Sequence, residues 1–203
     1  MLKLHSWKLS PNAFKVRLVL HELGLPFELT EVEILQGAGQ KAEFLALNPN
    51  GKVPVLEDEA LVLWESNAIV IYLARKAGRL LPTDPEGQAL VDQWLFWQAA
   101  HYYQPVVALA LENIVKPMFE QAADQSIVAS QSKDFRRMSG VLDHHLSQYE
   151  WLAGELSVAD LAVASTLQPR VQLGIDVSGY QFLGPWLAKI EALESWKKAN
   201  SGA

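Results

Sequence analysis

The sequence contains no cysteine among its 203 residues. That absence excludes disulfide bonds, thiolate metal sites and any mechanism that uses a protein thiol. No apolar run approaches the roughly 18 residues that a membrane-spanning helix needs, and no stretch is strongly basic. Because the formal net charge is −6 and the pI is about 5.4, we do not expect the chain to bind nucleic acid or an anionic membrane.

The composition is that of a globular protein, with 50% hydrophobic and 20% charged residues. The length suffices for one large domain or two small ones. The amino end, residues 1–5, enters strand-like sequence directly and shows no signal-peptide pattern. We therefore expect a cytoplasmic protein.

The first 76 residues alternate between strand and helix patterns. Residues 2–5 and 27–32 favour strands. Between them, residues 12–23 favour a helix that ends before Gly24, and residues 36–47 are weakly helical. This order predicts a small mixed sheet with helices packed on it.

Residues 48–72 form the most informative stretch. The turn signal Asn-Pro-Asn-Gly at 48–51 precedes a short apolar run that Pro54 interrupts. A second apolar run at 61–64 completes a predicted β-hairpin, and a helix begins at about Glu65. Because the first turn of a helix exposes backbone N–H groups and the positive end of the helix dipole, this point favours an anion.

From Gln88 onward only helices are expected. A Pro- and Gly-rich segment at residues 77–87 separates them from the first part. Pro105 should kink or interrupt a helix. Ser157 and Asp160 form a capping box before a helix at about 158–168, which is apolar nearly all round and should be buried. A last helix is expected over residues 185–198.

The segments G-K-V-P-V-L, L-W-E-S-N-A-I and I-Y-L, in this order between residues 51 and 73, resemble the glutathione-binding segment of the glutathione S-transferases. The resemblance covers essentially the whole chain. It implies an α/β plus all-α protein, in which an N-terminal thioredoxin-like glutathione-binding domain (1–76) and a linker (77–87) precede an all-helical C-terminal domain (88–203). It also implies a homodimer.

Glutathione has two carboxylates, an ammonium group and a thiol, and the chain offers a match for each. Glu65 can accept from the γ-glutamyl ammonium group, and Ser66 can hold the adjacent carboxylate, although a plain N-cap is the alternative for Ser66. The resemblance implies a cis bond at Pro54 that turns the Val53 backbone toward the cysteinyl unit. Expected ligands of the glycyl carboxylate are Lys52, for which a solvated turn lysine is the alternative, and either Gln40 or Lys41.

Ser10 is the predicted thiolate-stabilising residue. It precedes Val16 by six positions, with Lys15 before the valine, a spacing similar to that of the serine-type transferases. The alternative is purely structural, since a serine followed by Pro11 is a strong helix start. Because proline lacks the backbone N–H that a glycine would offer, Asn12 is a second candidate. The loop contains no tyrosine, so a tyrosine-type mechanism is not supported.

The electrophile is expected to bind beside the sulfur. An aromatic stripe at helical spacing can equally belong to a core or a dimer interface. With that alternative open, the residues expected to line the electrophile pocket are Leu9, Pro11, Trp97, His101, Tyr102 and Gln104.

The sequence thus predicts a serine-type glutathione transferase of the bacterial, phi or theta-like kind, in which a glutathione thiolate attacks a small hydrophobic electrophile. Glutathione is the expected co-substrate, and no metal or tightly bound cofactor is expected. Two alternatives use the same site: a non-catalytic glutathione- or ligand-binding protein, and a glutathione-dependent peroxidase or isomerase.

Overall fold

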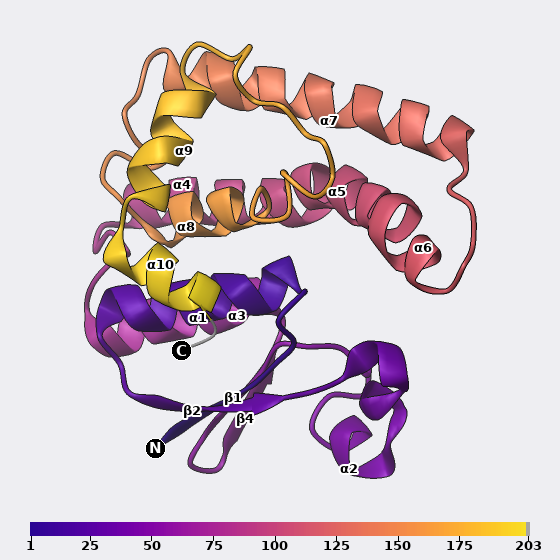
Figure 1. The fold of residues 1–203 in the computed structure, drawn as a ribbon. Helices are drawn as coiled ribbons and strands as arrows, with labels where there is room; N and C mark the ends of the chain where they lie inside the picture. Colours follow the sequence, from indigo (N-terminus) through magenta and orange to yellow (C-terminus); the bar gives the residue numbers. More distant parts are fainter. Residues whose placement is uncertain (202–203) are drawn as a thin grey trace. The chain divides into compact units, whose positions relative to one another are not determined.

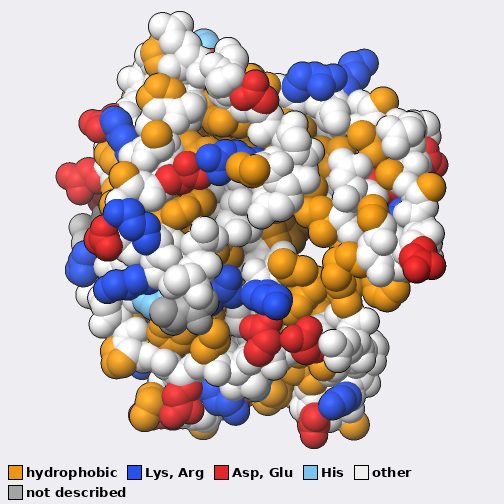
Figure 2. Space-filling view, viewed as in Figure 1, with side chains coloured by type: hydrophobic (Ala, Val, Ile, Leu, Met, Phe, Trp, Pro, Cys, Tyr) orange, Lys and Arg blue, Asp and Glu red, His pale blue; other side chains and the backbone are white. Residues whose placement is uncertain are grey.

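The computed structural model describes residues 1–201. Its contacts divide the chain into two compact units: Met1–Leu81 together with residues 191–201, and Pro82–Ile190. The division after Leu81 falls inside the segment expected to be a linker. Among the described residues, no helix is long and apolar enough to cross a membrane. Acidic and basic side chains are interspersed over the face drawn in Figure 2.

The first unit contains a four-stranded sheet in the order β2-β1-β3-β4. The pair β1–β2 is parallel, and the other two pairs are antiparallel. A parallel pair needs a crossover connection, which helix α1 provides, and a short turn joins β3 to β4 as predicted. The strands are β1 (Leu2–Ser6), β2 (Phe27–Glu31), β3 (Val55–Asp58) and β4 (Leu61–Trp64).

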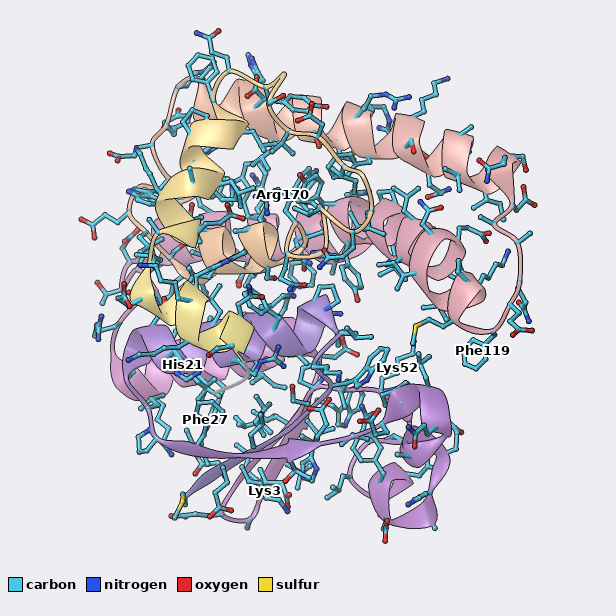
Figure 3. All side chains as sticks on the ribbon, in the orientation of Figure 1. Lys3, His21, Phe27, Lys52, Phe119 and Arg170 are labelled. Atoms are coloured by element: carbon cyan, nitrogen blue, oxygen red, sulfur yellow. The ribbon has the colours of Figure 1, made fainter. Side chains whose placement is uncertain are left out.

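Helices α1 (Pro11–Leu23) and α3 (Ser66–Ala77) lie on one face of this sheet (Figure 1), and α10 (Glu194–Ser201) packs on α1. Helix α1 ends at Gly24, whose φ of 68° is a left-handed conformation that glycine adopts without strain. The ring of His21 then contacts Phe27 at the start of β2, with centroids 5.3 Å apart (Figure 3).

The weakly helical region after β2 folds as short pieces. These are the 3₁₀ turns η1 (Ile34–Gln36) and η2 (Ala38–Gln40) and helix α2 (Ala42–Leu45). Phe44 of α2 joins Val32 and Val55 in a small hydrophobic cluster. The ring of Phe44 also meets His5 of β1 edge to face, so this segment packs against the sheet.

The last predicted helix, over residues 185–198, is two helices in the structure. Helix α9 (Leu183–Glu191) belongs to the second unit up to Ile190, whereas α10 packs on α1 in the first. The ring of Trp196 meets Phe14 at 4.8 Å between centroids, and Arg17 Nε donates to the Ala199 carbonyl at 3.3 Å. The break follows from this packing, which local helix propensity does not report.

Among described residues the second unit is built mainly of helices, and Pro105 lies inside a continuing helix. A π-helical segment, η3 (Gln98–Tyr102), directly precedes it. Such a segment accommodates a missing N–H by shifting the hydrogen-bond ladder. A π segment thus precedes α5, the helix in which a kink or interruption was expected at Pro105. The elements are α4 (Pro85–Trp97), η3, α5 (Tyr103–Ala110), η4 (Leu111–Val115), α6 (Lys116–Met118), α7 (Gln125–Leu146), α8 (Val158–Ser165) and α9.

The predicted capping box at the start of α8 is confirmed. Asp160 is fully buried and accepts from the backbone N–H groups of Leu152 and Ser157, both at 3.0 Å, and from Trp186 Nε1 at 3.1 Å. Burial raises the pKa of Asp160, and these donors act in the opposite direction. Asp160 therefore joins three segments of the second unit.

We expect Asp160→Ala to lower the free energy of unfolding by roughly 3–5 kcal/mol, because several buried donors lose their acceptor. The matched control is Asp124→Ala. Asp124 is the exposed N-cap of α7, and its loss should cost about 1 kcal/mol. Urea titration of both variants measures the difference, and equal losses would contradict this account of Asp160.

Candidate functional site

The sheet register brings three of the predicted site segments to one end of the strands. His5 of β1 is paired with Val55 of β3, which is paired with Trp64 of β4. The loop that follows β1, the residues before β3 and the residues after β4 therefore meet at the same end of the sheet. Ser10 lies in the first of these segments, Pro54 in the second and Glu65 in the third.

The Val53–Pro54 peptide bond is cis, as expected. The turn before it is held by Asn48, which is 2% exposed. Asn48 Nδ2 donates to the Lys52 carbonyl at 2.6 Å, and Asn48 Oδ1 accepts from the Asn50 N–H at 3.0 Å. Sequence reasoning treated Asn48 only as part of a turn signal, whereas the structure shows that it positions the loop carrying Lys52, whose side chain is exposed (Figure 3).

The structure brings Gln40 to the same turn. Gly51 has a φ of 63°, and a Cβ at this position would lie 2.5 Å from Gln40 Nε2 and 2.8 Å from the Gly39 carbonyl oxygen. Only glycine fits such a close approach. Gln40 therefore lies against the residue that precedes Lys52, whereas Lys41 is exposed at the start of α2.

Glu65 is the residue that precedes α3, and its backbone is strained. Its φ is 71° and its ψ is 104°, a conformation that costs roughly 1–3 kcal/mol in a non-glycine residue. Such strain is concentrated at functional sites. Because α3 begins at Ser66, the alternative that Ser66 is a plain N-cap is wrong. Ser66 is buried and Glu65 is exposed.

A buried lysine from α1 lies beneath this helix start. Lys15 is 1% exposed, and its Nζ donates to Ser66 Oγ at 3.0 Å and to Asn67 Oδ1 at 2.6 Å. Burial lowers the pKa of Lys15 to about 7, while the charge of Glu65 acts to raise it. Sequence reasoning noted Lys15 only for its spacing. The available signal was a lysine between two apolar residues, Phe14 and Val16, on the helix.

Ser10 is the N-cap of α1, which confirms its structural role. Ser10 Oγ accepts from the Ala13 N–H at 3.2 Å, and Pro11 is the first helical residue. A hydroxyl that accepts a hydrogen bond keeps its own hydrogen for donation, so capping is compatible with a second role. Ser10, Pro11 and Asn12 are half-buried, and Leu9 is exposed.

The predicted electrophile pocket requires a correction at Tyr102. This side chain is fully buried, stacks on Trp97 and Phe135 at 5.0 and 5.6 Å between centroids, and places its hydroxyl 3.4 Å from Ser139 Oγ. Tyr102 is therefore a core residue of the second unit, the alternative left open for an aromatic stripe. His101 and Gln104 are exposed. Tyr102 continues the buried face of these helical segments, on which Leu95, Gln98 and Val106 also lie.

Comparisons with known proteins agree with this architecture. A family model for the N-terminal domain of glutathione S-transferases matches residues 9–76, and one for the C-terminal domain matches residues 106–199. Glutathione S-transferase 3 of Zea mays is 36% identical over 180 residues, which cover 83% of this chain and 81% of that protein. A glutathione S-transferase of Hyoscyamus muticus is 31% identical over 207 residues, 98% and 97% of the two chains.

Solved structures show the same fold. A structure of glutathione S-transferase-I bound with lactoylglutathione superposes with a TM-score of 0.91 at 27% identity and covers 98% of each chain. The fold is thus a thioredoxin-like sheet domain followed by a helical domain. On the matches to both domains and to the full-length relatives, the chain belongs to the glutathione S-transferase family.

We expect Lys15→Met to change how stability depends on pH. An unfolded lysine has a pKa near 10.5 and Lys15 in the folded protein one of about 7, so the unfolded chain holds more protons between these values. The penalty of burying Lys15 is therefore complete below pH 7 and disappears as the pH rises toward 10.5, by about 1.4 kcal/mol per pH unit. In urea titrations at pH 7, 8 and 9, the stability of the variant relative to the wild type should fall steadily. A constant difference would contradict the low pKa.

Proposed function

We propose that this protein is a glutathione transferase that stabilises the glutathione thiolate for attack on a hydrophobic electrophile. The observation that carries the proposal is the meeting, at one edge of the sheet, of the loop before α1, the cis Val53–Pro54 bond and the start of α3. The membership of the chain in the glutathione S-transferase family supports it.

The γ-glutamyl end of glutathione fits the start of α3. The exposed Glu65 carboxylate can accept from the ammonium group. Ser66 lies in the first turn of the helix, where backbone N–H groups favour a carboxylate. Because Ser66 Oγ already accepts from Lys15, the Ser66 hydroxyl hydrogen remains to be donated to the ligand.

The rest of the tripeptide is assigned to the turn before β3. The Val53 backbone lies outside the β3 ladder, which begins at Val55, and is proposed to pair with the cysteinyl unit. Lys52 and Gln40, brought together around Gly51, are proposed to bind the glycyl carboxylate. The exposed Lys41 is a less direct alternative.

The sulfur is assigned to Ser10. Lowering a thiol pKa from about 8.5 by ~2 units requires ~2.7 kcal/mol of preferential thiolate stabilisation. A hydrogen bond to a charged group contributes about 1.5–3 kcal/mol, so the Ser10 hydroxyl with the α1 dipole suffices. Asn12 stays the second candidate. Leu9 and Pro11 are proposed to flank the electrophile, and Trp97, His101 and Gln104 stay predictions.

We further propose that the protein is a cytoplasmic homodimer that uses glutathione as co-substrate and has no tightly bound cofactor. The proposed domains are residues 1–76 and 88–203, joined by 77–87. The packing of α10 on α1 means that the carboxyl end also supports the first domain.

A second candidate function is glutathione binding without turnover, and Pro11 favours it. Proline removes one backbone N–H from the first turn of α1, and that turn is where thiolate stabilisation is needed. Retention on immobilised glutathione without turnover of an aryl halide or a hydroperoxide would support this function. Turnover of the hydroperoxide alone would indicate a peroxidase.

We expect Ser10→Ala to lower kcat/KM with an aryl halide by about 10–150-fold, the equivalent of one hydrogen bond to a charged group. The ultraviolet absorbance of bound thiolate, followed against pH, should show a higher thiol pKa. Asn12→Ala is the matched comparison and should change both quantities less. Undiminished kcat/KM in Ser10→Ala would remove this residue from the mechanism. Urea titration separates a catalytic loss from the loss of the helix cap.

We expect Glu65→Gln to raise the KM for glutathione by about 10–100-fold, because the ammonium group loses a charged acceptor. Glu59→Gln is the control, since Glu59 is also exposed and also has a positive φ, of 55°, but lies in the β3–β4 turn. Steady-state kinetics with glutathione as the varied substrate measures both. Equal effects of the two substitutions would contradict the assignment of Glu65.

A further inference from the structure

Lys15 is a cation enclosed at the proposed carboxylate site. Its side chain is 1% exposed, and its ammonium group is within hydrogen-bond distance of two neutral oxygens, Ser66 Oγ and Asn67 Oδ1. Both belong to the first turn of α3. A buried lysine readily exchanges its proton as its surroundings change, so the charge on Lys15 will respond to an anion that binds at this turn.

The charge of Glu65 raises the pKa of Lys15, against the larger effect of burial, which lowers it. Arg17, two residues further along α1, is directed elsewhere, since it donates to Ser6 Oγ and the Ala199 carbonyl. The other titratable groups on α1 and on the elements packed against it are Lys3 and His5 on β1, His21 and Glu22 on α1, Tyr72, Arg75 and Lys76 on α3, and Glu194, Lys197 and Lys198 on α10.

We propose that Lys15 is a positioning residue that takes up a proton from solvent when the γ-glutamyl carboxylate of glutathione binds at the start of α3. The inference rests on the proposed function. The protonated Nζ donates to Ser66 Oγ, and the Ser66 hydroxyl donates to the carboxylate. One Nζ–H bond forms, and its proton comes from the buffer. Lys15 thus acts on the ligand through Ser66 rather than by touching it.

This coupling gives binding and chemistry opposite dependences on pH. Above pH 7 the free protein holds a largely neutral Lys15, so binding requires uptake of a proton and affinity falls as the pH rises. Thiolate formation becomes easier over the same range. The expected result is a KM for glutathione that rises from pH 7 to 9 without a parallel loss of kcat.

The test uses S-methylglutathione, which has both carboxylates and no ionisable thiol. Calorimetric titrations in phosphate and Bis-tris at pH 6, and in phosphate and Tris at pH 8, report the protons exchanged. We expect the wild type to take up more than half a proton at pH 8 and little at pH 6, and to lose about 5–10-fold in affinity between them. Uptake by the ligand's own amino group is common to all variants and cancels in the comparison.

Two substitutions and a control complete the experiment. Lys15→Met should abolish the difference in uptake, bind more weakly than the wild type at pH 6 and show nearly constant affinity. Lys15→Arg stays charged, so it should bind at both pH values without uptake. Lys133→Met removes an exposed lysine from α7 and should behave like the wild type. Circular dichroism verifies folding. If the Lys15 variants do not fold, the proton uptake of the wild type at pH 8 and the change in its affinity between pH 6 and 8 test the proposal.

The outcomes separate this inference from the proposed function. If the wild type binds S-methylglutathione with no more proton uptake than Lys15→Met, or with unchanged affinity between pH 6 and 8, the role of Lys15 is overturned and glutathione binding stands. If the wild type binds neither S-methylglutathione nor glutathione at millimolar concentration, the proposed function fails, and the inference fails with it.

Discussion

The site depends on the position of β3 between β1 and β4. Because β3 is antiparallel to both neighbours, its beginning lies beside the end of each. One cis bond and the loops that lead into two helices are therefore held at the same edge by backbone hydrogen bonds of the sheet. A shift of one residue in either ladder would turn the side chains of the shifted strand to the opposite face of the sheet. The buried side chains that fix the register therefore also fix the positions of the site residues.

The two helix starts at this edge are joined by a contact that costs stability. Lys15 of α1 crosses to the first turn of α3, and its burial disfavours the charged ammonium group. Glu65 adds a strained backbone conformation at the same place. Proteins retain such features where the surrounding structure compensates for them and where function uses them. Here the compensation comes from the apolar packing of α1 against α3 and α10.

In the second unit, the buried carboxylate of Asp160 has a structural role. Asp160 is as deeply buried as Lys15, but its donors come from three segments of the unit. That network holds the start of α8 in place. Both carboxylate oxygens of Asp160 accept hydrogen bonds from groups of the same unit. Burial of a titratable group alone therefore does not distinguish a functional site from a structural one. Lys15 differs from Asp160 in lying against the strained start of α3, where the γ-glutamyl carboxylate is proposed to bind.

Local sequence determined much of this protein. The strands, α1 with its glycine stop, the hairpin and the capping box follow from short-range rules of backbone geometry and hydrophobic period, and the structure confirms them. The glutathione-binding pattern was predicted from its resemblance to the transferase family, and the family-model matches confirm the family. Tertiary structure decided the features that depend on distant residues. Asn48 and Gln40 both contact the turn at residues 48–52, Tyr102 is enclosed by Phe135 and Ser139 of α7, and α10 packs on α1 of the first unit. Lys15 reaches Ser66 across 51 positions of sequence, and its burial comes from elements that pack on α1 from elsewhere in the chain. No local pattern reports such contacts, because periodicity specifies which face of a helix is apolar but not which residue lies opposite it.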